Sequence, residues 1–178
     1  MKMWKNSTAI MAGVLVAWAF ASCSTSKDQL NKQIAKAEQE IAQQYDTTKM
    51  NELITLYRDY VKRFPTDSLS GEYLFRWATT DMVLGKGADA LRDFANLINL
   101  FPQHRLLPEA YYYKAHIYEN IMYDLSMAKM AYYDFLTRFP EHKLAKDATL
   151  SIQYLGKSAD EIIAFFEQTY SDTAQPIQ

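Results

Sequence analysis

Residues 128–140 read AKMAYYDFLTRFP, and this segment ends in a tripeptide that occurs three times in the chain. The copies are RFP at 63–65, LFP at 100–102 and RFP at 138–140, so their phenylalanines are 37 and 38 residues apart. A fixed period of this length indicates a repeat protein, in which each repeat is one supersecondary unit. Proline disfavours helical geometry in the residue before it, so we expect a helix to end at each tripeptide.

The residues ahead of each tripeptide repeat the same apolar pattern. Spacings of three and four residues place the apolar side chains on one face of a helix. The corresponding sets are Leu53, Tyr57, Tyr60 and Val61; Ala90, Phe94, Leu97 and Ile98; and Ala128, Tyr132, Phe135 and Leu136.

Two helical stretches fit between successive tripeptides, which predicts a helical hairpin in each repeat. The expected helices are 72–84 with 88–100, and 109–122 with 125–138. Gly85-Lys86-Gly87 supplies a permissive turn in the first hairpin, and Asp124 is a suitable N-cap in the second. We therefore predict clear repeats at 71–107 and 108–145.

The flanking segments also show helical periodicity. Residues 29–45 form an amphipathic helix or a short coiled coil, and residues 48–63 form the second helix of a degenerate unit. Residues 144–155 form a further first helix, and the capping box from Ser158 to Glu161 opens the last one. The prediction is an all-α domain at 29–170 with about eight helices and no strands, followed by a flexible tail at 171–178.

The two-helix units resemble tetratricopeptide repeats. The second clear repeat carries the resemblance best, and the first departs from it at Asp81, where the family usually has tyrosine. The resemblance implies an α-solenoid of antiparallel helix pairs whose first helices line a concave groove. The residues that carry it are Tyr111, Ala115, Tyr118, Ala128, Tyr132, Phe135 and Pro140.

By this register, six residues are candidates for binding a partner in the groove: Phe75, Thr79, Tyr112, His116, Glu119 and Tyr154. Three of them are aromatic and are not required by the repeat pattern. Aromatic anchors in a groove suit an extended or helical peptide. The alternative is that the chain's own N- or C-terminal helix fills the groove.

The beginning of the chain has the pattern of an export signal. Lys2 and Lys5 precede an uncharged apolar run at 9–20, which is too short to span a bilayer comfortably. The run ends at Ala21-Ser22-Cys23, which contains the only cysteine and resembles the lipobox of bacterial lipoproteins. The resemblance implies a signal peptide at 1–22, lipidation of Cys23 and a tether at 23–28. The alternatives are an uncleaved anchor, or an export signal followed by an incidental cysteine.

The residue after the cysteine bears on localisation. Ser24 is not the aspartate that retains such lipoproteins in the inner membrane, so the resemblance favours the outer membrane. A single Lys-Asp pair matches acidic surface-export signals poorly, which favours the periplasmic face over the cell surface.

Composition and motifs narrow the classes of function. A net charge of -2 argues against a nucleic-acid binder, which usually shows a positive excess. No phosphate loop, metalloprotease or nucleophile-elbow motif appears, so we expect no catalytic residues, no metal site and no cofactor. His104 and His142 occupy equivalent loop positions, with Asp67 in the matching place of the first copy. We therefore expect helix caps there rather than zinc ligands. An enzyme is the remaining alternative to a non-catalytic protein.

The pattern over residues 132–148 resembles the outer-membrane assembly lipoprotein family and the repeat part of the Tol-Pal-associated coordinator family. The leading hypothesis is a non-catalytic, lipid-anchored scaffold of the bacterial envelope that binds an envelope protein or peptide in its groove and assists outer-membrane protein assembly. The alternative is a structural or cell-division adaptor on a peptidoglycan-linked complex.

Overall fold

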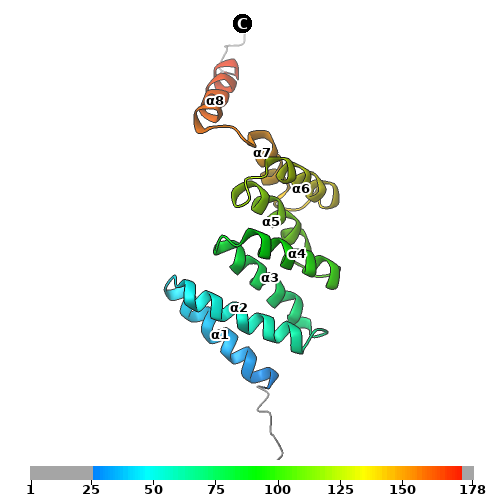
Figure 1. Ribbon diagram of the computed structural model, residues 1–178. Helices are drawn as coiled ribbons and strands as arrows, with labels where there is room; N and C mark the ends of the chain where they lie inside the picture. Colours follow the sequence, from blue (N-terminus) through cyan, green and yellow to red (C-terminus); the bar gives the residue numbers. More distant parts are fainter. Residues whose placement is uncertain (1–25, 174–178) are drawn as a thin grey trace, which may run out of the picture.

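The computed structural model describes residues 26–173, which form eight α-helices and no strand (Figure 1). This confirms the predicted all-α fold built of helical repeats. The helices are α1 (Lys27–Gln43), α2 (Thr47–Arg63), α3 (Ser68–Val83), α4 (Gly87–Leu100), α5 (Leu107–Asn120), α6 (Leu125–Arg138), α7 (Ala145–Tyr154) and α8 (Ala159–Thr173).

From α1 to α7 the helices form an elongated stack in which each helix packs against the next (Figure 1). The contacts are most extensive within the pairs α3–α4 and α5–α6, which are the two predicted clear repeats. The last helix, α8, projects beyond α7 at one end of the stack (Figure 1).

The repeated tripeptides adopt one backbone conformation. Phe64, Phe101 and Phe139 have φ of -128°, -129° and -134° and ψ of 54°, 60° and 55°. Each donates its amide hydrogen to the carbonyl four residues earlier, at distances of 2.9 Å. The sequence repeat is therefore also a repeat of backbone geometry, which turns the chain in the same way after α2, α4 and α6.

Equivalent apolar residues occupy equivalent places in the core. Tyr57, Phe94 and Tyr132 share one register position and are at most 2% exposed. The core consists of three successive clusters, which join α1 to α3, α3 to α5 and α5 to α7. Contacts therefore run between neighbouring elements, as expected for a solenoid.

The hairpin turns differ in part from the prediction. Gly85 has a φ of 73°, as a permissive turn residue should, but Gly87 is buried in α4. A Cβ there would lie 2.8 Å from the Met122 sulfur, so Gly87 is required for close packing and not for the turn. In the next hairpin the position of Gly85 is taken by Tyr123, with a φ of 54°.

Several predicted boundaries also shift. α1 begins two residues before the expected start of the domain. α3 begins at Ser68 instead of the expected residue 72, and the Asp67 side chain caps it by accepting the Leu69 amide hydrogen. α8 continues to Thr173, inside the segment expected to be a flexible tail. The predicted signal peptide at 1–22, the lipidation site Cys23 and the first half of the tether lie outside the described residues.

Candidate partner-binding face

The first helices of the successive pairs lie next to one another along one side of the stack. Tyr73 of α3 donates to Asn31 of α1 at 3.0 Å, and Phe75 of α3 contacts Tyr113 of α5 with ring centroids 6.0 Å apart. Tyr112 of α5 packs in the same core cluster as Ala148 and Ile152 of α7. We call this side, formed by α1, α3, α5 and α7, the first-helix face. It brings most of the candidate partner-binding residues to one side of the molecule.

Two of the aromatic candidates are also part of the core. Phe75 packs edge-on against Phe94, with centroids 5.6 Å apart. Tyr112 contacts the rings of Tyr132 and Phe135 at 5.7 and 5.6 Å. Both are only partly exposed, so they line the floor of the face while holding their helix pairs together.

Thr79 and Tyr154 have partners within the chain. The Thr79 hydroxyl donates to the Arg76 carbonyl at 2.9 Å. The Tyr154 ring contacts Phe165 and Phe166 of α8, with centroids 5.9 and 5.8 Å apart. Tyr154 therefore links α7 to α8.

His116 and Glu119 lie on the same side of α5 as Tyr112. Glu119 accepts a hydrogen bond of 2.6 Å from the Tyr132 hydroxyl. The Nδ1 atom of His116 is buried and has no hydrogen-bond partner among the described residues. A buried polar atom without a partner is uncommon in native proteins, and a bound water or ion is one way in which such an atom is satisfied.

Burial and neighbouring negative charge raise the pKa of both Tyr132 and Tyr112. Burial raises the pKa of Tyr132, and its hydrogen bond to Glu119 raises it further. Burial also raises the pKa of Tyr112, with the negative charges of Asp147 and Glu119 adding to the effect. Both hydroxyls therefore keep their protons at neutral pH.

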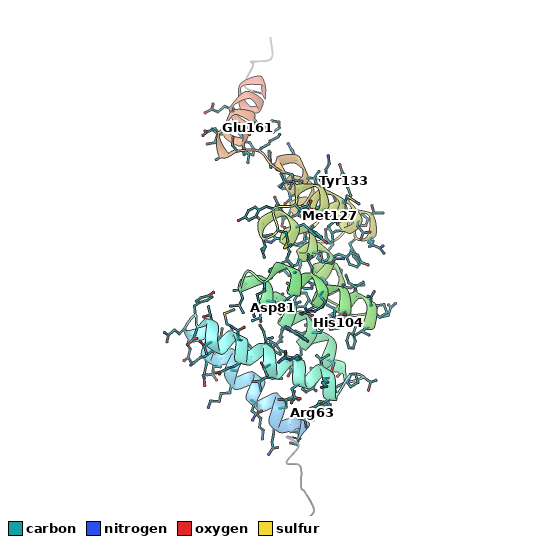
Figure 2. The ribbon with its side chains drawn as sticks, in the orientation of Figure 1. Arg63, Asp81, His104, Met127, Tyr133 and Glu161 are labelled. Atoms are coloured by element: carbon teal, nitrogen blue, oxygen red, sulfur yellow. The ribbon has the colours of Figure 1, made fainter. Side chains whose placement is uncertain are left out.

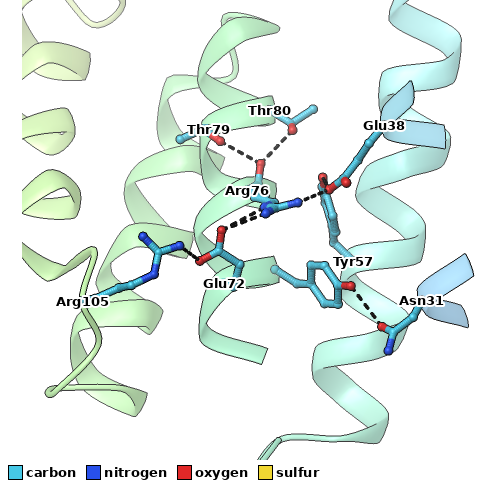
Figure 3. Close-up of polar contacts among 9 residues, drawn as sticks. Asn31, Glu38, Tyr57, Glu72, Arg76, Thr79, Thr80 and Arg105 are labelled. Carbon is cyan, nitrogen blue, oxygen red and sulfur yellow. Dashed lines mark hydrogen bonds and ion pairs between the residues drawn. The ribbon is translucent and has the colours of Figure 1, made fainter. Parts of the chain in front are cut away.

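A charge network on this face was not foreseen from the sequence (Figure 3). Arg76 pairs with Glu38 at 2.7 Å and with Glu72 at 3.0 Å, and Glu72 also pairs with Arg105 at 2.6 Å. The Glu72–Arg76 pair can be read from its spacing of four residues on a helix. The other two pairs join segments far apart in sequence, which a repeat pattern does not reveal.

A hollow of about 550 Å³ adjoins this network and is lined in part by Arg76, His104 and Arg105. Its arginines are already neutralised by Glu38 and Glu72, so the hollow has no excess of positive charge with which to hold an anion.

The loop histidines each accept the backbone amide two residues further on, but they do not cap the helices as predicted, because the N-cap residues of α5 and α7 are Leu106 and Leu144, which have no side-chain cap hydrogen bond. His104 Nδ1 accepts the Leu106 amide and His142 Nδ1 accepts the Leu144 amide, each at 3.3 Å. Asp67 accepts the Leu69 amide in the same register at 2.9 Å. Within residues 26–173 no group of three or more histidine, cysteine or acidic side chains is placed to hold a metal ion.

Several exposed apolar side chains lie elsewhere, around α6. Tyr123 is 79% exposed, Met130 65% and Tyr133 51%. Figure 2 shows Met127 and Tyr133 on α6. The repeat register accounts only for the buried side of that helix, so it does not predict these exposed residues.

Within the described part of the chain no helix is long and apolar enough to cross a membrane. No protein-family model matches the sequence, and no curated protein matches it either. The case for a function therefore depends on the residues themselves.

Proposed function

We propose that this protein is a lipid-anchored, non-catalytic interaction scaffold of the bacterial cell envelope. The observation that supports it best is the first-helix face, where half-buried aromatic rings adjoin polar side chains such as His116, whose Nδ1 has no hydrogen-bond partner among the described residues. A protein or peptide partner would cover the rings.

The proposed anchor is Cys23, which follows the apolar run and two small residues. Several acyl chains would hold the protein stably at a membrane, since each buried CH₂ contributes about 0.8 kcal/mol. The proposed location is the periplasmic face of the outer membrane, and the proposed process is outer-membrane protein assembly.

A crosslinking pull-down from native membranes tests the scaffold function. We expect a specific envelope protein to be recovered with the wild-type chain and lost with His116→Ala/Glu119→Gln. Phe75 and Tyr112 are less suitable positions, because their replacement also loosens the core. Equal recovery with the variant would contradict the proposal for this face. Recovery of a peptidoglycan-linked complex instead of assembly components would favour the adaptor hypothesis.

Replacing Cys23 tests the anchor. Cys23→Ser should abolish labelling by a fatty-acid probe and release the protein from the membrane fraction, or leave it held by an uncleaved signal. Labelling that persists in the variant would show that lipidation is not at Cys23.

A further inference from the structure

The last two helices have the connection of a repeat pair, but they do not pack as one. Residues 155–158 join α7 to α8, and this connection is as long as the one at 121–124 between α5 and α6. Gly156 has a φ of 77°, close to the 73° of Gly85 in the turn between α3 and α4. Among the described residues, however, α8 does not pack along its length against any other helix, and it projects from the end of the stack (Figure 1). The fourth pair is therefore open.

On the first helices, one register position shows what α7 lacks. Phe75, Tyr112 and Leu150 are 37 and 38 residues apart. Phe75 of α3 packs against Phe94 of α4 at 5.6 Å, and Tyr112 of α5 packs against Tyr132 of α6 at 5.7 Å. Leu150 of α7 stays 37% exposed, because α8 does not cover it. The side of α7 that should receive a second helix is thus uncovered.

On the second helices, the matching position shows what α8 lacks. Phe94, Tyr132 and Phe166 are each the eighth residue of their helix. The first two are fully buried, whereas Phe166 is 43% exposed and Ile163 beside it 55% exposed. Phe166 contacts Tyr154 at the end of α7, with centroids 5.8 Å apart, but this contact does not bury it. In the described chain α8 therefore presents the apolar face of a second helix that has not been covered.

We propose that α8 of one copy packs on α7 of a second copy, with Phe166 against Leu150, and that the second copy returns the same contact. The two faces match because they are the two halves of one repeat pair. A reciprocal exchange about a two-fold axis covers both open ends and leaves no such face for a third copy. The exchange is bimolecular, so α8 stays open in the dilute chain and closes as the concentration rises. The inference goes beyond the scaffold function and does not depend on it.

Charge favours this arrangement over direct pairing of the two α8 helices. α8 contains no lysine or arginine, and two such helices side by side would repel each other. α7 carries one lysine and one aspartate, so it is neutral and does not repel an acidic helix. The acidic residues of α8 are Asp160, Glu161, Glu167 and Asp172.

Photocrosslinking in cells that express two differently tagged copies of the full chain tests the exchange. One copy carries Phe166→p-benzoyl-phenylalanine, and the other carries no probe. We expect irradiation to join the two copies, and mass spectrometry to map the adduct to α7 of the second copy around Leu150. The same probe at Leu100, which is 65% exposed at the end of α4, is the matched control and should give no adduct between copies.

A charge on α7 localises the contact. Leu150→Glu in the copy without the probe should lower the yield of the adduct about tenfold, because a carboxylate would be buried against Phe166. Leu100→Glu also places a charge at an exposed leucine and should leave the yield unchanged.

Three results would overturn the exchange. The first is an adduct confined to one chain, between residue 166 and its own α7, which would show that α8 closes on its own stack. The second is irradiation that joins no two copies. The third is an adduct between copies that maps outside α7 or keeps its yield in Leu150→Glu. The scaffold function has a separate readout, which is recovery of an envelope protein in the pull-down.

Discussion

At the scale of single residues, Tyr123 carries the clearest local strain. It has a φ of 54° in a turn whose counterpart in the preceding repeat is Gly85, with a φ of 73°. A residue with a Cβ is disfavoured in this region by about 1–2 kcal/mol. The side chain is 79% exposed, so packing does little to offset the cost.

Tyr123→Gly should therefore stabilise the protein. Relief of the strain exceeds the extra chain entropy of glycine, and we expect the free energy of unfolding to rise by about 0.5–1 kcal/mol. Urea titration measures this. Tyr133→Gly is a matched control, because it removes an exposed tyrosine from the interior of α6 and should cost about 0.5–1 kcal/mol. A loss of stability in Tyr123→Gly would mean that the tyrosine makes a compensating contact.

His104 should make stability depend on pH. Its Nδ1 accepts the Leu106 amide, and its ring packs against Gly71, where a Cβ would lie 2.7 Å away. Burial lowers the pKa of His104 below its usual value. Between the folded and unfolded pKa values the unfolded state binds the proton more readily, so acidification favours unfolding.

We therefore expect stability to fall as the pH drops through about 6.5 toward the lower folded-state pKa. His104→Gln should be less stable at pH 7.5 but should lose less stability between pH 7.5 and pH 5. Denaturant unfolding of both proteins at the two pH values measures the difference. An identical pH dependence in the two proteins would show that His104 is not the titrating group.

At the scale of helices, the repeat register makes Phe94 and Tyr132 equivalent. Both are fully buried, and each belongs to a core cluster that joins its own helix pair to a neighbouring helix. Phe94→Ala and Tyr132→Ala should each lower the free energy of unfolding by about 3–5 kcal/mol. Thermal melts followed by circular dichroism measure this.

Tyr132→Phe keeps the ring and removes only the hydroxyl that donates to Glu119, so it should cost about 1 kcal/mol. Alanine variants that melt within a couple of degrees of the wild type would show that these positions are not core.

The helices were predictable because their signals are local. Periodicity, the tripeptides and the caps at Asp124 and Ser158 each lie within a few residues of the feature that they specify. Gly87 was misread as a turn residue because its role depends on Met122 in another helix pair. The network around Arg76 was missed for the same reason, since Glu38 and Arg105 approach it only in the folded stack.

The sequence predicts on which side of α5 the candidate residues lie, but not all the contacts that they make. The register placed Tyr112, His116 and Glu119 on one side of α5, where the structure has them. It did not reveal that Phe75 and Tyr112 also pack in the core, nor that Ala148 and Ile152 of α7 share a core cluster with Tyr112. These contacts depend on how successive helix pairs are rotated against one another. The volumes of the side chains packed between the pairs determine that rotation.

At the scale of the whole molecule, the two ends of the stack differ. The end formed by α1 buries Leu30 and Ile34 against its neighbours and turns mainly polar residues outward. At the other end α8 leaves Ile163 55% exposed and Phe166 43% exposed. Repeat arrays usually end in units with a polar outer face, because each core cluster needs a cover.

This difference should appear in amide hydrogen exchange of the full chain. We expect α3 to α6 to be most protected, because each packs against a helix on both sides, and α8 to exchange fastest, because it contacts the stack chiefly through Tyr154. Mass spectrometry after timed exchange resolves the helices.

Deuterium uptake of α8 that does not change with protein concentration would fit a helix exposed in the monomer. Protection of α8 equal to that of α5 would contradict the prediction and would show that its apolar face is covered in solution. Protection that grows with concentration would identify that cover as a second copy of the chain.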